Sequence, residues 1–272
     1  MDTMVQFGPD RRLVGVLSGT PASSAGPIVV LPSAGLLPRA GPFRLHVELS
    51  RRLARQGVSS FRFDVPGVGE APRLKGCGGR EATLAALDHL ATFHGARQFV
   101  VGGVCSAADV AWGVALADPR VCGVLMLDGL SYTGPWFQLA LAAGVFKRPI
   151  REWPGVVRRL MGRMQKQESE RAPVIEDYRD WPERPQAQSE FARLVARDVR
   201  SLWVYTGGYT ARFLHPRQFA WSFGGTARDR RVVMHYWPDC DHTFFARAHR
   251  DRLMDTVERW LLNNFPTEPL ST

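Results

Sequence analysis

The sequence predicts an α/β domain with a mostly parallel central sheet flanked by helices. Short apolar runs rich in Val, Ile and Leu alternate with segments whose apolar residues recur at three- and four-residue spacing, which is typical of βαβ units. No internal repeat or low-complexity tract interrupts this alternation. The chain has 272 residues, of which 45% are hydrophobic and 22% charged, so it is long enough to bury one large core.

The predicted elements begin with an antiparallel hairpin and continue with buried strands separated by helices. The hairpin strands are expected at Met4–Phe7 and Arg12–Leu17. The buried strands are expected at Ile28–Leu31, Ser60–Phe63, Phe99–Gly103, Val124–Leu127, Ser201–Tyr205 and Arg231–Tyr236. The helices are expected at Arg44–Gln56, Ala82–His94, Ser106–Ala117 and about Arg250–Asn264.

Composition excludes several classes of protein. The four cysteines form no C-x-x-C pair, so neither a disulfide scaffold nor a zinc site is predicted. No Gly-rich phosphate loop, metal-ligand cluster or base-stacking aromatic pattern occurs, which predicts no cofactor and no nucleic-acid partner. The acidic start lacks a signal-peptide pattern and no apolar run reaches about 18 residues, so we expect a cytoplasmic protein without a membrane span. Assembly as a homodimer stays open.

One long interval breaks the regular spacing and predicts an inserted lid. About seventy residues separate Leu127 from Ser201, far more than one crossover helix needs. We therefore divide the chain into a core of residues 1–128 and 201–272 and a cap of residues 129–200. The aromatic residues Trp136, Phe137 and Trp153 are candidates for contact with a substrate under this cap. A plain structural embellishment is the alternative.

The middle of this interval is strongly basic. Residues 147–171 carry eight Lys and Arg against three Glu, within a chain of net charge +9 that has only three lysines. Apolar residues recur at helical spacing over Gly155–Lys166, which predicts an amphipathic helix with a basic outer face. Two interpretations stay open: a solvated face whose arginines reflect codon composition, or a surface that attracts an anionic acyl substrate on coenzyme A or an acidic carrier protein.

A tight turn between a strand and a helix marks the candidate nucleophile. In Gly103-Val104-Cys105-Ser106-Ala107, small residues stand two before and two after Cys105, as a nucleophile elbow requires. Centring the turn on Ser106 would put branched Val104 where a glycine is needed. At the start of the following helix, the dipole and free N–H groups favour a thiolate at Cys105, and the Ser106 N–H is expected to form half of an oxyanion hole. A buried structural cysteine is the alternative.

A histidine near the C-terminus is the candidate general base. His242 lies in a loop that follows a predicted strand and precedes the last predicted helix, so its ring can reach the carboxyl edge of the sheet. His215, His235 and His249 lack this context.

Taken together, these motifs resemble those of α/β-hydrolases, in the serine-aminopeptidase-like or lysophospholipase-like branch, over nearly the whole chain. The run from Val29 to Gly35 resembles the family's oxyanion loop, which implies that the Gly35 N–H completes the oxyanion hole. The run from Phe61 to Glu70 resembles its R-x-D-x-x-G-x-G turn, in which Arg62 and Asp64 are structural. A cysteine elbow implies acyl transfer from an ester or thioester through an acyl-cysteine, by a hydrolase, thioesterase or acyltransferase whose substrate is a small or carrier-bound acyl compound.

The sequence departs from the family at the catalytic acid. The usual position follows the next-to-last strand, but Trp203–Phe213 contains no carboxylate, and Asp229 lies too far along the chain. Asp128, at the end of the preceding strand, is the best substitute; organising its loop is an equal alternative. A Cys–His dyad without an acid, or a catalytically silent binding or partner protein, also stays open.

Overall fold

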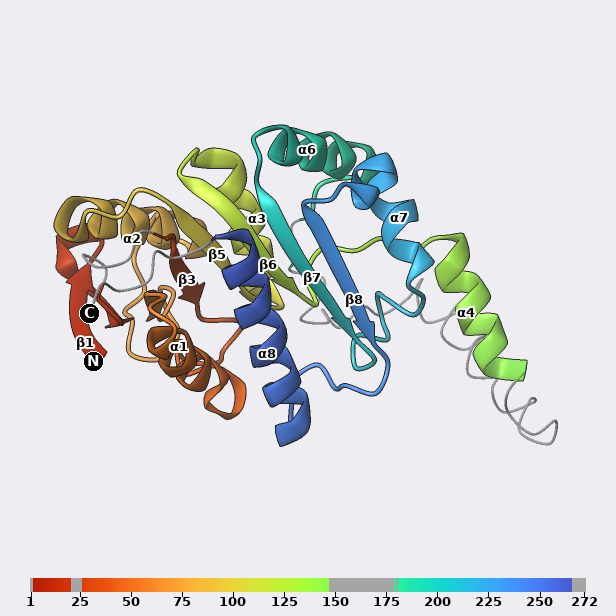
Figure 1. The fold of residues 1–272 in the computed structure, drawn as a ribbon, viewed down its shortest axis with the longest axis horizontal. Helices are drawn as coiled ribbons and strands as arrows, with labels where there is room; N and C mark the ends of the chain where they lie inside the picture. The colour runs from red at the N-terminus through yellow and green to blue at the C-terminus, as the bar shows by residue number, and fades with distance from the viewer. Residues whose placement is uncertain (1, 21–25, 147–178, 180, 266–272) are drawn as a thin grey trace.

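An eight-stranded, strongly twisted sheet runs through the molecule in the order β1-β2-β4-β3-β5-β6-β7-β8 (Figure 1). This computed structural model describes residues 2–20, 26–146, 179 and 181–265. The pairs β1–β2 and β2–β4 are antiparallel, and every later pair is parallel. The strands are β1 (Asp2–Phe7), β2 (Leu13–Ser18), β3 (Ile28–Pro32), β4 (Ser60–Phe63), β5 (Phe99–Val104), β6 (Val121–Leu127), β7 (Arg200–Thr206) and β8 (Val232–Trp237).

Helices cover both faces of the sheet (Figure 1). Helices α1 and α8 pack on one face, and α2, α3, α6 and α7 on the other. Helix α4 extends away from the sheet and contacts α7. The helices are α1 (Leu45–Arg55), α2 (Gly79–His94), α3 (Ser106–Ala117), α4 (Pro135–Phe146), α6 (Arg184–Ala196), α7 (Arg217–Phe223) and α8 (Arg247–Asn264), with short 3₁₀ turns at Pro9–Arg11, Pro42–Arg44 and Gly224–Arg228.

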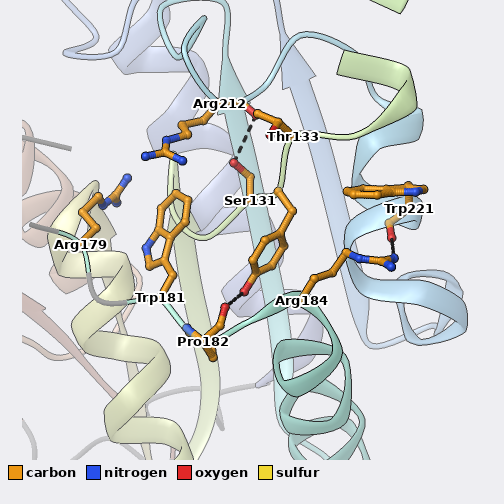
Figure 2. Close-up of a pocket in the computed structure, with 9 residues that line it drawn as sticks. Ser131, Thr133, Arg179, Trp181, Pro182, Arg184, Arg212 and Trp221 are labelled. Atoms are coloured by element: carbon orange, nitrogen blue, oxygen red, sulfur yellow. Dashed lines mark hydrogen bonds between the residues drawn. The ribbon is translucent and has the colours of Figure 1, made fainter. Parts of the chain in front are cut away.

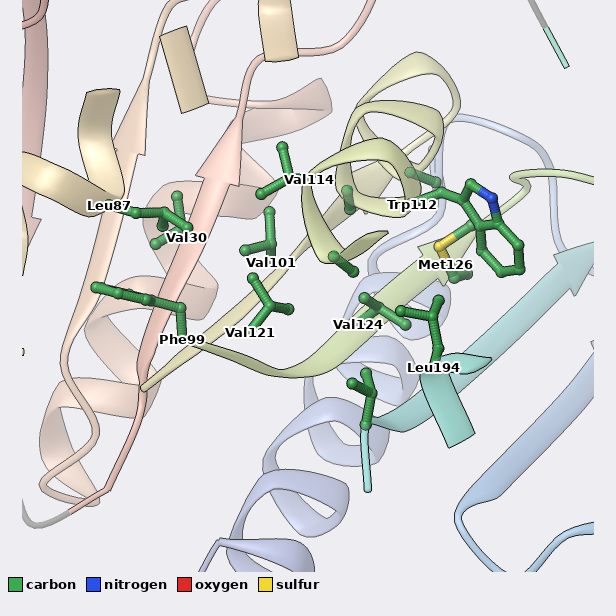
Figure 3. Packing of buried hydrophobic residues seen from close by; sticks show 14 of the residues in the cluster. Val30, Leu87, Phe99, Val101, Trp112, Val114, Val121, Val124, Met126 and Leu194 are labelled. Atoms are coloured by element: carbon green, nitrogen blue, oxygen red, sulfur yellow. The ribbon is translucent and has the colours of Figure 1, made fainter. Parts of the chain in front are cut away.

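Alternation along the strands divides the core into two layers. On β7, Leu202 and Val204 face α1 and α8, whereas Trp203 and Tyr205 face the opposite helices. Figure 3 shows the second layer around β5 and β6, where Val101 and Val124 meet side chains from α2, α3 and α6. Because the central strands are buried on both faces, their sequences are continuously apolar rather than alternating.

The predicted fold class is confirmed: the sheet is mostly parallel, opens with an antiparallel hairpin and is flanked by helices. Helix α2 begins three residues before the predicted start because the Glu81 carboxylate accepts a hydrogen bond from the Gly78 N–H and caps the first turn. Helix α7 was not expected, since seven residues are too few for a helical pattern to stand out.

The end of the predicted cap interval belongs to the core by its packing. On α6, Phe191 and Leu194 are buried in the same cluster as Trp203, and Glu190 accepts a hydrogen bond from the Trp112 indole at 2.8 Å. This helix therefore serves as the crossover between β6 and β7. Within the described ranges, none of the helices combines the length and the hydropathy that crossing a membrane requires.

Trp203 is the most consequential core side chain on β7. Its ring is fully buried and lies 4.8 Å from the Phe223 ring centre and 5.2 Å from that of Phe219. We expect Trp203→Ala to lower the free energy of unfolding in urea by about 3–5 kcal/mol, because it removes a large side chain from a packed layer. Phe93→Ala, at a ring that is 70% exposed, is the control and should cost less than about 1 kcal/mol. Equal losses would show that Trp203 does not anchor this layer.

Candidate active site

Strand register brings two of the predicted site residues to one edge of the sheet. Val104 pairs with Leu127, and Leu127 pairs with Val204, so β5, β6 and β7 end together. The next residues continue this pattern: the Cys105 N–H donates to the Leu127 carbonyl at 2.8 Å, and the Asp128 N–H donates to the Val204 carbonyl at 2.9 Å. Cys105 and Asp128 therefore leave adjacent strands at the same level.

The chain turns sharply at Cys105. Its backbone dihedrals, φ 57° and ψ −123°, lie in a region that non-glycine residues rarely adopt, and the residue directly precedes α3. A Cβ on Gly103 would lie only 2.7 Å from the Ala107 Cβ, which explains the small residues on both sides of the turn. This is the strand–turn–helix geometry of a nucleophile elbow, with the half-buried Cys105 side chain at its apex.

The carboxylate of Asp128 is fully buried and holds the His242 ring. Its Oδ2 lies 2.8 Å from His242 Nδ1 and accepts the Thr206 hydroxyl at 2.6 Å, while its Oδ1 accepts the Thr206 N–H at 2.7 Å. The two interpretations of Asp128, as an acid that orients His242 and as a residue that organises its loop, are therefore compatible. The same carboxylate contacts the imidazole and the end of β7. Because Asp128 contacts Nδ1 of the His242 ring, Nε2 is the ring nitrogen that remains for the hydrogen bond with the Cys105 thiol.

Two glycines explain why no acid stands after β7. A Cβ on Gly208 would lie 2.2 Å from the His242 backbone nitrogen, and one on Gly207 would lie 2.0 Å from the Pro238 carbonyl oxygen. Backbone hydrogen bonds from both glycines, to the Cys240 and Trp237 carbonyls, fix the histidine loop against this turn. The loop occupies the space that a side chain would need.

The charges of this site favour a thiolate beside an imidazolium. Burial alone would raise the pKa of Cys105, but a hydrogen bond with His242 and the positive charge of Arg179 outweigh it and lower the pKa below the ordinary value. Burial likewise opposes protonation of His242, but hydrogen bonds to Asp128 and Cys105 raise its pKa to about 10.

Comparisons with known proteins agree on the architecture. The chain superposes on a protein of unknown function from Agrobacterium tumefaciens with a TM-score of 0.58 and 14% identity over 99% of this chain and 100% of that one. A Pyrococcus furiosus esterase superposes with a TM-score of 0.57 and 12% identity over 97% of this chain and 90% of that one. A Xanthomonas campestris α/β serine hydrolase without a lid superposes with a TM-score of 0.56 and 14% identity over 99% of this chain and 96% of that one. No protein-family model and no curated protein sequence matches the chain.

This chain has the α/β-hydrolase fold. At identities this low, the likeness establishes the architecture and leaves the chemistry to the site itself. Placed on this fold, the candidate nucleophile follows β5, the candidate acid follows β6 and the candidate base follows β8.

Arg179 also contacts this candidate site and was not anticipated. Its guanidinium pairs with Asp109 at 2.6 Å, donates to the Tyr209 hydroxyl at 2.6 Å and to the Asp128 carbonyl at 3.3 Å. The Tyr209 ring in turn stacks on His242, with ring centres 5.7 Å apart. Nothing in the sequence around Arg179 could have indicated this role, because its partners come from three distant segments.

The two predicted oxyanion-hole donors, the N–H groups of Ser106 and Gly35, differ in their surroundings. The Ser106 N–H lies at the free N-terminus of α3, as expected. The Gly35 N–H instead donates to the Ser106 hydroxyl at 2.8 Å. One residue earlier, Ala34 is buried and its N–H has no acceptor within the described part of the chain, so the sequence reasoning missed a candidate donor.

Of the predicted substrate-contacting aromatics, Trp136 and Phe137 lie on α4. On α4, Trp136 stacks on His215 at 5.3 Å between ring centres and carries the Arg217 guanidinium at 4.8 Å. It therefore packs α4 against the α7 segment, and the neighbouring Phe137 is half-buried on the same helix. Trp153 and the basic segment 147–171 lie outside the described residues.

Two other groups of polar residues have structural partners. Asp64 accepts hydrogen bonds from the Arg39 N–H and guanidinium and from the Glu70 N–H, as the structural interpretation of that turn expects. Ligand-type atoms of Cys240, Asp241 and His249 lie within 4.8 Å of one another. Burial raises the pKa of the Cys240 thiol to about 12, and Asp241 accepts hydrogen bonds from the N–H groups of its own loop.

The lowered pKa predicts which cysteine reacts. Thiolate forms as pH rises through the thiol pKa, so alkylation of Cys105 by iodoacetamide should reach half its maximal rate below about pH 8.5, the value of an ordinary thiol. His242→Ala removes the hydrogen bond that lowers the pKa of Cys105 and should therefore slow alkylation at pH 7. Peptide mass spectrometry resolves the four cysteines.

Cys122 is the internal control for this experiment. Burial raises its pKa to about 12, so it should stay unlabelled in the folded protein at pH 7. A half-maximal rate for Cys105 at or above pH 8.5, or no effect of His242→Ala, would contradict the assigned ion pair.

Proposed function

We propose that this protein cleaves an ester or thioester through an acyl-cysteine intermediate, with Cys105 as nucleophile, His242 as acid–base and Asp128 as the orienting acid. The observation that supports this most strongly is the 2.8 Å contact between the buried Asp128 carboxylate and His242 Nδ1 at the edge where Cys105 also ends its strand. Nucleophile, base and orienting group therefore occur in the order that covalent acyl transfer requires.

In the first half-reaction, the Cys105 thiolate attacks the carbonyl carbon, and the carbonyl oxygen takes up the negative charge. The proposed hydrogen-bond donors to that oxygen are the Ser106 N–H and either the Ala34 N–H or the Gly35 N–H, which here donates to the Ser106 hydroxyl. As the tetrahedral intermediate collapses, the bond to the leaving group breaks. The proton on His242 Nε2 moves to the departing oxygen or sulfur, and Cys105 retains the acyl group as a thioester.

In the second half-reaction, neutral His242 removes a proton from water or from another acceptor as that molecule attacks the thioester. Collapse releases the acid or the transferred product and restores the thiolate beside the imidazolium. The Asp128 contact keeps Nδ1 protonated throughout, so Nε2 exchanges the proton in both halves.

A silent binding protein was favoured by the absence of an acid after β7. The contact of His242 with the Asp128 carboxylate, at the end of β6, supports the enzyme instead. For the cap, we propose residues 129–183 rather than 129–200, since α6 packs into the core.

Substitutions at the elbow test the nucleophile. Cys105→Ala should reduce kcat/KM for an activated ester by about 10⁴-fold, because the attacking atom is gone. Ser106→Ala should retain at least about a tenth of the activity, since the backbone N–H, rather than the hydroxyl, is the proposed donor. Cys122→Ala serves as a control at a cysteine remote from the elbow. An active Cys105→Ala together with an inactive Ser106→Ala would overturn this assignment.

Asp128→Asn tests the acid. The substitution preserves side-chain size but cannot hold the Nδ1–H tautomer equally well, so kcat should fall by about 10²- to 10⁴-fold while circular dichroism stays native. Its alkylation rate at pH 7 should fall as well, because His242 loses the group that raises its pKa. A kcat within about threefold of wild type would mean that Cys105 and His242 act without this carboxylate.

A further inference from the structure

A basic pocket of about 460 Å³ is lined by the residues drawn in Figure 2. Its walls come from the residues after β6, the segment leading into α6, the turn after β7 and α7. Among the described residues that line it, three are arginines and none is acidic: Ser131, Tyr132, Thr133, Arg179, Trp181, Pro182, Arg184, Arg212 and Trp221.

Two of these arginines are held by aromatic rings rather than by carboxylates. The Arg212 guanidinium lies 5.1 Å from the Trp181 ring centre, and that of Arg184 lies 4.4 Å from Trp221. Arg184 also donates to the Trp221 carbonyl at 3.3 Å. Neither forms an ion pair with any residue that the structure describes.

Stacking on a ring fixes a guanidinium but leaves N–H groups along its edge to bind an oxyanion. Both arginines are half-buried, so an anion between them would be screened less by water than one at the surface. Arg179 adds a third guanidinium, 4.8 Å from the Trp181 ring centre, whose charge Asp109 balances. The described lining of the pocket therefore carries an excess of positive charge.

The pocket shares a wall with the catalytic residues. Ser131 follows Asp128 by three residues, and Arg179 reaches from the pocket to the Asp128 carbonyl and to Tyr209, on which His242 stacks. Arg179 therefore belongs both to the pocket and to the group of residues around Asp128 and His242.

We propose that this pocket binds an anionic group, a carboxylate or a phosphate, of the ester or thioester cleaved at Cys105. This inference rests on the proposed function and names the class of its substrate. The anion either ends the acyl chain or belongs to the leaving group, and two pairs of substrates distinguish these sources.

The first pair places the charge on the acyl chain: mono(4-nitrophenyl) glutarate against the neutral 4-nitrophenyl pentanoate. The second places it on the leaving group: pentanoyl pantetheine 4′-phosphate against pentanoyl pantetheine. In one of the two pairs, the wild-type enzyme should have a kcat/KM about tenfold or more higher for the anionic substrate than for the neutral one. The pair that shows this difference identifies where the anion lies. Arg212→Gln should reduce that preference by about 10- to 100-fold, as expected for loss of a charged hydrogen bond.

Arg184→Gln provides a second pocket variant, and Arg193→Gln provides the matched control. Arg193 is exposed on α6 and does not line the pocket, so its loss changes net charge equally. A preference that falls in both pocket variants and persists in Arg193→Gln supports the proposal. Equal kcat/KM within both pairs, or an equal loss in all three variants, overturns it.

Binding measured without turnover separates this proposal from the proposed function. Calorimetric titration of the Cys105→Ala protein with glutarate and with inorganic phosphate should show binding of at least one anion, weakened about tenfold or more by adding Arg212→Gln. Anion binding in a protein that cleaves no ester would support an anion site in the pocket and refute the proposed function. Ester cleavage without binding of either anion and without charge preference would support the proposed function and refute the anion-binding pocket.

Discussion

The hydrogen bonds around the buried Asp128 carboxylate are the constraint on which the site depends. A fully buried carboxylate is costly unless its oxygens are paired, and here Thr206 and His242 provide the partners. The same contacts tie the end of β6 to the end of β7 and to the loop after β8. Positioning the imidazole and closing this edge of the sheet are thus one interaction. The hydrogen bond to Asp128 raises the pKa of His242, and the hydrogen bond with His242 and the charge of Arg179 lower the pKa of Cys105.

Much of this arrangement could be predicted from local sequence. Continuous apolar runs such as Phe99–Gly103 identify strands buried on both faces, and the small residues two before and two after Cys105 identify a tight turn. Asp128 could be named as a candidate because adjacent parallel strands end at the same level. Whether its carboxylate meets the ring of His242 depends on register and on loop packing, which local sequence does not encode.

The remaining features arise from contacts between distant segments. Gly207 and Gly208 suggest only a turn in the sequence, yet the space they leave admits the histidine loop. Arg179 pairs with Asp109 and Tyr209 across the site, so no spacing rule indicates it. Trp136 was selected as an aromatic in a long interval, but its ring packs on His215, since an exposed helix such as α4 needs an anchor on the core.

The most direct test of the account is to trap the covalent intermediate. Wild-type protein mixed with 4-nitrophenyl acetate, quenched in acid within milliseconds and digested, should carry an acetyl group on Cys105 that neutral hydroxylamine removes, as expected for a thioester. Mass spectrometry of the peptide containing Cys105 reads the result. Steady release of 4-nitrophenol with the acetyl group on another residue, or with no acetyl-enzyme while Cys105→Ala remains equally active, would contradict the central claim.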